Sequence, residues 1–157
     1  MRYHSKTAST ISRTAFTLFA SVLLVLSHSA QARDTKHHFS IADALASPAY
    51  EGKLNSAIKL YFGDQTYPAP TSKQGEYVSN KKTNAFGKSD LKACEWVLLS
   101  ALISLQERAV AEGGNAVVNI RSYYKKNEFS SATQYECHAG AIMAGVALIG
   151  DVVTLPE

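Results

Sequence analysis

The chain has 157 residues, which is enough for one domain and too few for two. Its 16 lysines and arginines outnumber 13 aspartates and glutamates, but three of the basic residues and none of the acidic ones lie in the first 32 positions. The rest of the chain carries 13 basic and 13 acidic side chains. This balance argues against nucleic-acid binding, because that needs a basic surface.

Residues 1–32 have the pattern of a secretory signal peptide. Basic residues precede an apolar run over residues 15–26, and Ala30-Gln31-Ala32 offers small residues for cleavage. We expect cleavage near Ala32 and a periplasmic or secreted location. An uncleaved membrane anchor is the rival, but spanning a bilayer takes about 20 apolar residues. We expect no membrane span in the mature chain.

Beyond the signal peptide, we expect an N-terminal tail and short helix over residues 33–56 and an α+β domain over residues 57–157. The first residues are polar and predict a loose tail. Ser40–Ala46 predicts the short, capped helix. Apolar side chains at every second position over residues 58–62 then predict a first strand.

Two prolines place an exposed loop over residues 67–75. Residues 77–86 are more polar and predict an extended edge strand. Lys81 and Lys82 would protect that edge from pairing with other chains.

The longest regular pattern is a helix over residues 90–113. Ser89 or Asp90 supplies its N-cap, and Gly113-Gly114 ends it. Residues 115–121 then alternate as a half-buried strand does. One helix face carries apolar side chains at three-to-four-residue spacing, namely Leu91, Cys94, Leu98, Leu102, Leu105 and Ala109.

Two more strands complete the predicted sheet. Residues 133–139 alternate, with Tyr135, Cys137 and Ala139 on one face. Residues 140–150 are small and apolar, and we expect a buried strand there; a glycine-rich membrane hairpin is the alternative. The result is a single small α+β domain, in which an antiparallel sheet packs against one long helix.

Both cysteines, Cys94 and Cys137, lie in the mature chain. An even pair in an exported protein is most simply a disulfide. Cys94 lies on the apolar helix face, and Cys137 shares a face with Tyr135 and Ala139. A Cys94–Cys137 bond would therefore tie the helix to the sheet within the core.

Residues 113–120, Gly-Gly-Asn-Ala-Val-Val-Asn-Ile, connect the helix to the strand that follows it. This corner resembles the "GANAV" strand of YbjQ-type domains, a family described as heavy-metal-binding, and of RcsF-like stress-sensor lipoprotein domains. The resemblance covers residues 90–155. It implies an RcsF/YbjQ-like antiparallel meander, with either a role in envelope homeostasis or a metal-binding oligomer.

The whole mature chain is similar to a family of small secreted Gram-negative proteins without an assigned role. They share blocks like Tyr61–Asp64, Asn80–Ser89 and Asn119–Asn127 of this sequence. Such proteins often carry the label "excinuclease ATPase subunit", which implies nucleotide-dependent DNA repair.

A phosphate-binding loop would require a glycine five positions before the Gly87-Lys88-Ser89 segment, and Lys82 stands there instead. We therefore expect this segment to be a loop that leads into the helix cap. We expect no cofactor, and we disfavour the DNA-repair activity.

The candidate metal ligands are Glu136, Cys137 and His138, with His37 and His38 in the tail. Zinc takes about four ligands in a tetrahedral array. A disulfide removes the thiolate, and adjacent strand residues point to opposite faces. We therefore expect no metal site.

An aromatic and basic surface is predicted at the end of the strand that follows the long helix. It comprises Arg121, Tyr123, Tyr124, Lys125 and Lys126. Such surfaces dock acidic polymers or partner proteins. The alternative is a solvent-facing strand end with no partner.

The sequence contains no nucleophile elbow and no recognisable catalytic triad, so we expect no enzyme. The leading hypothesis is an exported, disulfide-tied binding module in envelope homeostasis, which binds an envelope protein or polymer. Oligomer formation stays open, and a metal-binding or metal-responsive oligomer is the alternative.

Overall fold

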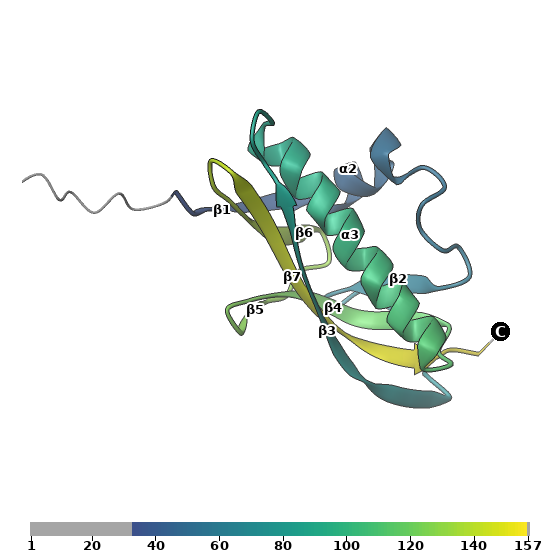
Figure 1. Ribbon diagram of the computed structural model, residues 1–157. Helices are drawn as coiled ribbons and strands as arrows, with labels where there is room; N and C mark the ends of the chain where they lie inside the picture. Colours follow the sequence, from purple (N-terminus) through teal and green to yellow (C-terminus); the bar gives the residue numbers. More distant parts are fainter. Residues whose placement is uncertain (1–32, 157) are drawn as a thin grey trace, which may run out of the picture. The chain divides into compact units, whose positions relative to one another are not determined.

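The computed structural model describes residues 33–156 (Figure 1), so the predicted signal peptide over residues 1–32 lies outside the described residues. No helix in the described part is long and apolar enough to cross a membrane. In chain order the elements are β1 (Thr35–Ser40), α2 (Ile41–Ala46), the 3-10 helix η1 (Pro48–Tyr50), β2 (Lys59–Phe62), β3 (Ser72–Asn84), α3 (Asp90–Ala111), β4 (Ala116–Tyr124), β5 (Asn127–Phe129), β6 (Gln134–Ala139) and β7 (Met143–Thr154).

The strands form one mixed sheet organised around β7. β3 runs antiparallel along one edge of β7, while β4 and β6 pair with successive parts of the other edge. β2 pairs parallel to β4, with Lys59 opposite Ala116. The expectation of a purely antiparallel sheet is therefore wrong. The connection from β2 to β4 contains β3 and α3, and a crossover of that length lets the chain return in the same direction.

The long helix α3 lies across one face of the sheet (Figure 1). Its residues 90–111 match the predicted helix to within two positions. The Ser89 side chain accepts the Lys92 N–H at 3.2 Å, so Ser89 is the N-cap. The chain leaves the helix through Gly113, whose φ of +74° favours glycine. Leu91, expected on the core face, is instead exposed at the start of the helix.

A bulge in β4 divides its apolar side chains between two cores. Asn119 has a φ of +52°, and the pairing register with β7 shifts between Val118 and Arg121. Val117 and Ile120 both belong to the main core beneath α3. Val118 belongs to a smaller core, whose other members are Ala116, Val153 and Leu155, covered by Tyr61 and Tyr67.

The N-terminal segment is part of the sheet, which corrects the expectation of a loose tail. β1 pairs antiparallel with β6 along its whole length, from Thr35 opposite Ala139 to Ser40 opposite Gln134. The short helix α2 follows as predicted, with Ser40 accepting the Asp43 N–H. A strand of such polar composition forms because β6 supplies the hydrogen bonds that the segment cannot make locally.

Two further differences concern β3 and β5. β3 begins at Ser72, so part of the predicted loop over 67–75 is extended; β3 lies at a sheet edge, as predicted. β5 pairs with the end of β4, in a hairpin that the sequence analysis did not predict.

Candidate functional site

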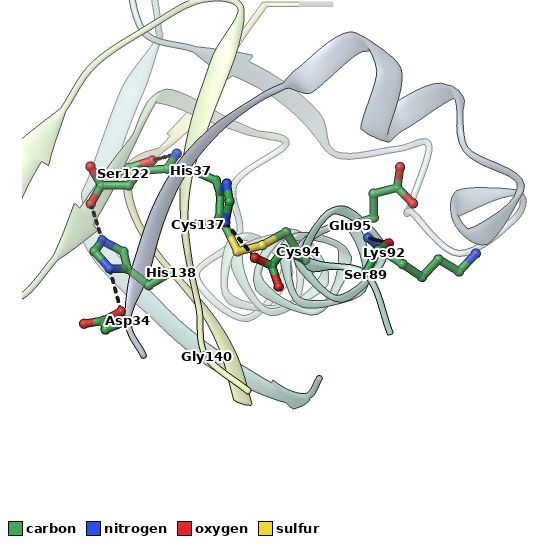
Figure 2. The surroundings of a disulfide bond; sticks show 12 residues. Asp34, His37, Ser89, Lys92, Cys94, Glu95, Ser122, Cys137, His138 and Gly140 are labelled. Atoms are coloured by element: carbon green, nitrogen blue, oxygen red, sulfur yellow. Dashed lines mark hydrogen bonds and ion pairs between the residues drawn. A yellow bond between two sulfur atoms is a disulfide. The ribbon is translucent and has the colours of Figure 1, made fainter. Parts of the chain in front are cut away.

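The predicted disulfide is present between α3 and β6 (Figure 2). The Cα atoms of Cys94 and Cys137 are 5.9 Å apart, and both residues are fully buried. Tyr135 and Ala139 flank Cys137 on the same buried face, as predicted. A buried disulfide is typical of proteins that fold in an oxidising compartment.

On the helix side of β6, β1 is joined to the start of α3 by charged groups. Two nitrogens of the Arg33 guanidinium donate to the two carboxylate oxygens of Asp90, at 2.8 and 2.7 Å. His37 Nε2 lies 2.9 Å from the same carboxylate. The Arg33 bonds, supported by His37 and opposed by burial, hold the pKa of Asp90 below its usual value. This contact fixes β1 beside the disulfide.

On the opposite side of β6 from Cys94, His138 lies beside Asp34 (Figure 2). These two residues belong to a histidine–carboxylate row that runs from Asp34 through His138 and Glu136 to His38. His138 Nδ1 lies 2.9 Å from Asp34, and its Nε2 lies 3.0 Å from Glu136. The His38 Nε2 atom lies 3.4 Å from the other oxygen of Glu136. The row connects β1 to β6 through side chains as well as through the backbone.

The two central groups of the row are largely shielded from water. Glu136 is 7% exposed and the His138 side chain 11%. Burial raises the pKa of Glu136, but hydrogen bonds with His138 and His38 and the charge of Lys36 outweigh burial and lower it overall. Burial also raises the pKa of Asp34, but interactions led by those with His138 outweigh burial and lower it overall.

Aromatic rings from the β4–β5 hairpin cover the row. The Tyr124 ring stacks on His138 with centroids 3.5 Å apart, and Phe129 stacks on His38 at 4.2 Å. The Tyr124 hydroxyl donates to Asp34 at 3.2 Å. The hairpin is thereby held against the β1–β6 pair.

The residues of the predicted aromatic and basic surface do not form one continuous surface, because they lie on both faces of this hairpin. Arg121 donates to Glu128 at 2.7 and 3.2 Å and to Glu76 at 2.9 Å. These bonds to Glu128 and Glu76 outweigh burial and raise the pKa of the guanidinium. Tyr124 lies in the stack against His138, and Tyr123 is half-buried. Arg121 and Tyr124 therefore stabilise the hairpin.

Lys125 and Lys126 form the two-residue turn between β4 and β5, and both are exposed. We call this pair the lysine turn. Their φ angles are +51° and +67°, values that a type I′ turn requires and that Asn-Gly adopts with less strain. Lys125 Nζ lies 3.5 Å from Asp34, so one side of the turn is also held electrostatically.

The other sequence candidates have structural roles. Lys88, which would face a phosphate in a nucleotide-binding loop, donates to the Asn84 carbonyl at 2.8 Å, and Ser89 caps α3 as predicted. Both sulfurs are in the disulfide, so no thiolate is available as a ligand. Across residues 33–156 no group of three or more histidine, cysteine or acidic side chains is arranged to hold a metal ion.

Sequence reasoning missed the row as a unit, although its pattern is readable. Polar side chains occupy every second position from the residue before β1 onward, at Asp34, Lys36 and His38, and again in β6 at Glu136 and His138. Once two strands pair in this register, the polar faces meet. The missing information was that residues 35–40 are a strand.

An open pocket of about 350 Å³ lies between α3 and the segment after η1. Gln106, which the sequence analysis also missed, is a buried residue that lines it. Its side-chain amide binds Asn55 and the carbonyl of Ile58. The pocket is therefore built around a structural clamp. Its lining residues are Lys53, Asn55, Ile103, Gln106, Glu107 and Val110.

Comparisons of the chain with protein-family models, with curated proteins and with solved structures found no match. The resemblances drawn from the sequence therefore stay predictions.

Proposed function

We propose that this protein is an exported binding module of the Gram-negative envelope that contributes to envelope homeostasis and has no catalytic role. The buried disulfide and the signal-peptide pattern support export to the periplasm or beyond. The binding surface is the lysine turn with the adjoining Tyr123. Two exposed amino groups favour an acidic partner, either an envelope protein or an anionic polymer.

The observation that carries this proposal is the backbone conformation of the lysine turn. Two side-chain-bearing residues at positive φ cost of order 1–3 kcal/mol each. Among the described residues, the amino group of Lys125 gains a long ion-pair contact with Asp34 and a position 5.0 Å from the centre of the Tyr124 ring, whereas Lys126 forms no ion pair. Strain of this kind is tolerated where the side chains are needed for function. The Arg121 ion pairs on one face and the Tyr124 stack on the other hold the turn in place.

The same geometry supplies a test that separates folding from binding. Lys125→Asn with Lys126→Gly installs the preferred type I′ residues and removes both charges. We expect the double variant to unfold at higher urea concentration, with a gain of at least about 1 kcal/mol, because the strain that is relieved exceeds the flexibility that glycine adds to the unfolded chain. Photo-crosslinking from position 123 in envelope preparations identifies the partner, and we expect the variant to bind that purified partner at least tenfold more weakly.

A variant with Lys53→Gln and Lys59→Gln serves as the matched control, because it removes two charges away from the hairpin. Wild-type affinity should also fall as ionic strength rises. If the Asn-Gly variant binds every crosslinked partner as tightly as the wild type, the lysine turn is not the binding surface.

The metal-binding alternative would have to use the histidine–carboxylate row, because both sulfurs are in the disulfide. Native mass spectrometry of protein purified from the exported fraction without chelator distinguishes the two readings. The binding-module reading expects a metal-free chain that is two hydrogens lighter than its reduced form. A stoichiometric metal adduct would favour the alternative.

A further inference from the structure

The β3–α3 loop meets the β6–β7 turn at one end of the domain (Figure 1). Exposed apolar side chains lie at this end. Phe86 in the loop is 74% exposed, and Ile142 in the turn is 64% exposed. The Ala85 N–H donates to the Ile142 carbonyl at 2.7 Å, so the two segments are adjacent. We call Phe86, Leu91, Ile142 and Met143 the apolar tip. Exposed apolar residues gathered in this way mark an interaction surface.

Basic side chains lie on the elements that form the apolar tip. Lys88 is in the same loop as Phe86, Lys92 follows Leu91 on α3, and Lys82 is two residues before the end of β3. Within residues 33–156 none of these three lysines forms an ion pair. Asp90, the carboxylate at the start of α3, is neutralised by Arg33. The tip therefore combines apolar side chains with uncompensated positive charge.

The described part of the chain also begins at this end. The Arg33 guanidinium donates to the Gly140 carbonyl at 3.0 Å, and a Cβ added to Gly140 would lie 2.6 Å from the Arg33 carbonyl oxygen. In the sequence, six residues separate the apolar run over 15–26 from Arg33. The seven Cα–Cα steps from residue 26 to residue 33 reach at most about 25 Å. A bilayer that holds this run before cleavage can therefore be no farther than that from Arg33.

We propose that the apolar tip docks on the surface of a bilayer that contains anionic phospholipid. Phe86 and Ile142 enter the boundary between headgroups and acyl chains, and Lys82, Lys88 and Lys92 contact the phosphates. The tip is distinct from the lysine turn, so the domain can hold its partner while it rests on the membrane.

The test is co-sedimentation of protein purified from the exported fraction with large vesicles. One set is phosphatidylethanolamine with about one-third phosphatidylglycerol, and the other is phosphatidylcholine alone. We expect binding to the anionic vesicles that weakens as salt is added. Phe86→Ser with Ile142→Ser should lower the partition coefficient at least tenfold, and Lys82→Gln with Lys88→Gln and Lys92→Gln should lower it several-fold.

The matched control replaces two other exposed apolar residues, Val78→Ser with Val110→Ser, each 55% exposed in the wild type. It should bind vesicles as the wild type does, and circular dichroism should show that all variants are folded. Absence of binding to anionic vesicles, or binding that the tip variant leaves unchanged, overturns the proposal. So does a dimer that the tip variant dissociates in the absence of vesicles, because a second copy would then cover the tip.

Discussion

Breaking the bond between Cys94 and Cys137 should lower the free energy of unfolding by about 4 kcal/mol. The two residues are 43 positions apart in the sequence. The loop-closure relation for a chain of that length gives an entropy of about 13 cal/mol/K, and hence about 4 kcal/mol at room temperature. Domains of this size are stable by only about 5–15 kcal/mol. The disulfide therefore supplies a large share of the total stability.

The assay is urea unfolding of oxidised and reduced wild-type protein, followed by the fluorescence of Trp96 and by circular dichroism. A slope of about 2 kcal/mol per molar urea is usual for small domains, so reduction should lower the midpoint by about 2 M. Cys94→Ala with Cys137→Ala should lower it further, because both sulfurs are fully buried and their removal leaves a cavity.

The double alanine variant is also the control, since reductant must leave its midpoint unchanged. A shift below about 0.5 M on reduction of the wild type, with the slope unchanged, would refute the reasoning. It would mean that the reduced, unfolded chain is already as restricted as the oxidised one.

Four other substitutions test single contacts, and urea unfolding measures each of them. Gln106→Leu removes three hydrogen bonds to the backbone of the segment after η1 and should lower the free energy of unfolding by about 2–3 kcal/mol. A loss below about 0.5 kcal/mol, the size expected for a neutral surface substitution, would show that these bonds do not hold the segment to α3. Gly63→Ala should cost at least about 2 kcal/mol, because the residue has a φ of +53° and an added Cβ would lie 2.6 Å from the Ser131 carbonyl carbon; a neutral result would show that the backbone can move apart. Tyr135→Phe should change stability by less than about 0.5 kcal/mol, because the buried hydroxyl has no hydrogen-bond partner within residues 33–156; a clear loss would reveal one. Glu136 has a folded pKa below the usual value of 4.5, so its stabilising contribution is present above that pH and is lost as pH falls below it. Glu136→Gln should therefore make the free energy of unfolding less dependent on pH in the acid range. An unchanged pH dependence would show that Glu136 does not cause the loss of stability in acid.

The sequence predicted the elements whose signals are local. The helix period, the Ser89 cap and the glycine stop defined α3 closely, because each depends on residues within a few positions of one another. Cys94 and Cys137 could be paired because both patterns placed them on buried faces. α2 was found from its cap for the same reason.

The errors concern interactions between distant parts of the chain. Nothing local in Lys59–Phe62 specifies a parallel partner, because that direction is set by the crossover through β3 and α3. β1 lacks an apolar alternation and becomes a strand only beside β6. The turn after Tyr124 is readable as a polar run, but the strand β5 that completes the hairpin was not predicted, because Lys-Lys lacks the Asn-Gly that usually signals a hairpin. The candidate site depends on the last two of these features, so it could not be assembled from the sequence.

The pairing of β1 with β6 has a consequence for the export that we propose for this protein. A chain that crosses a membrane N-terminus first delivers Thr35 early, whereas its partner Ala139 arrives near the end. The first strand to emerge must therefore wait for almost the whole chain before it can pair. During that interval Cys94 is already across without Cys137, so the oxidising machinery meets a lone thiol. Under the proposed export, completion of the fold and closure of the disulfide would therefore be late, nearly simultaneous events in translocation.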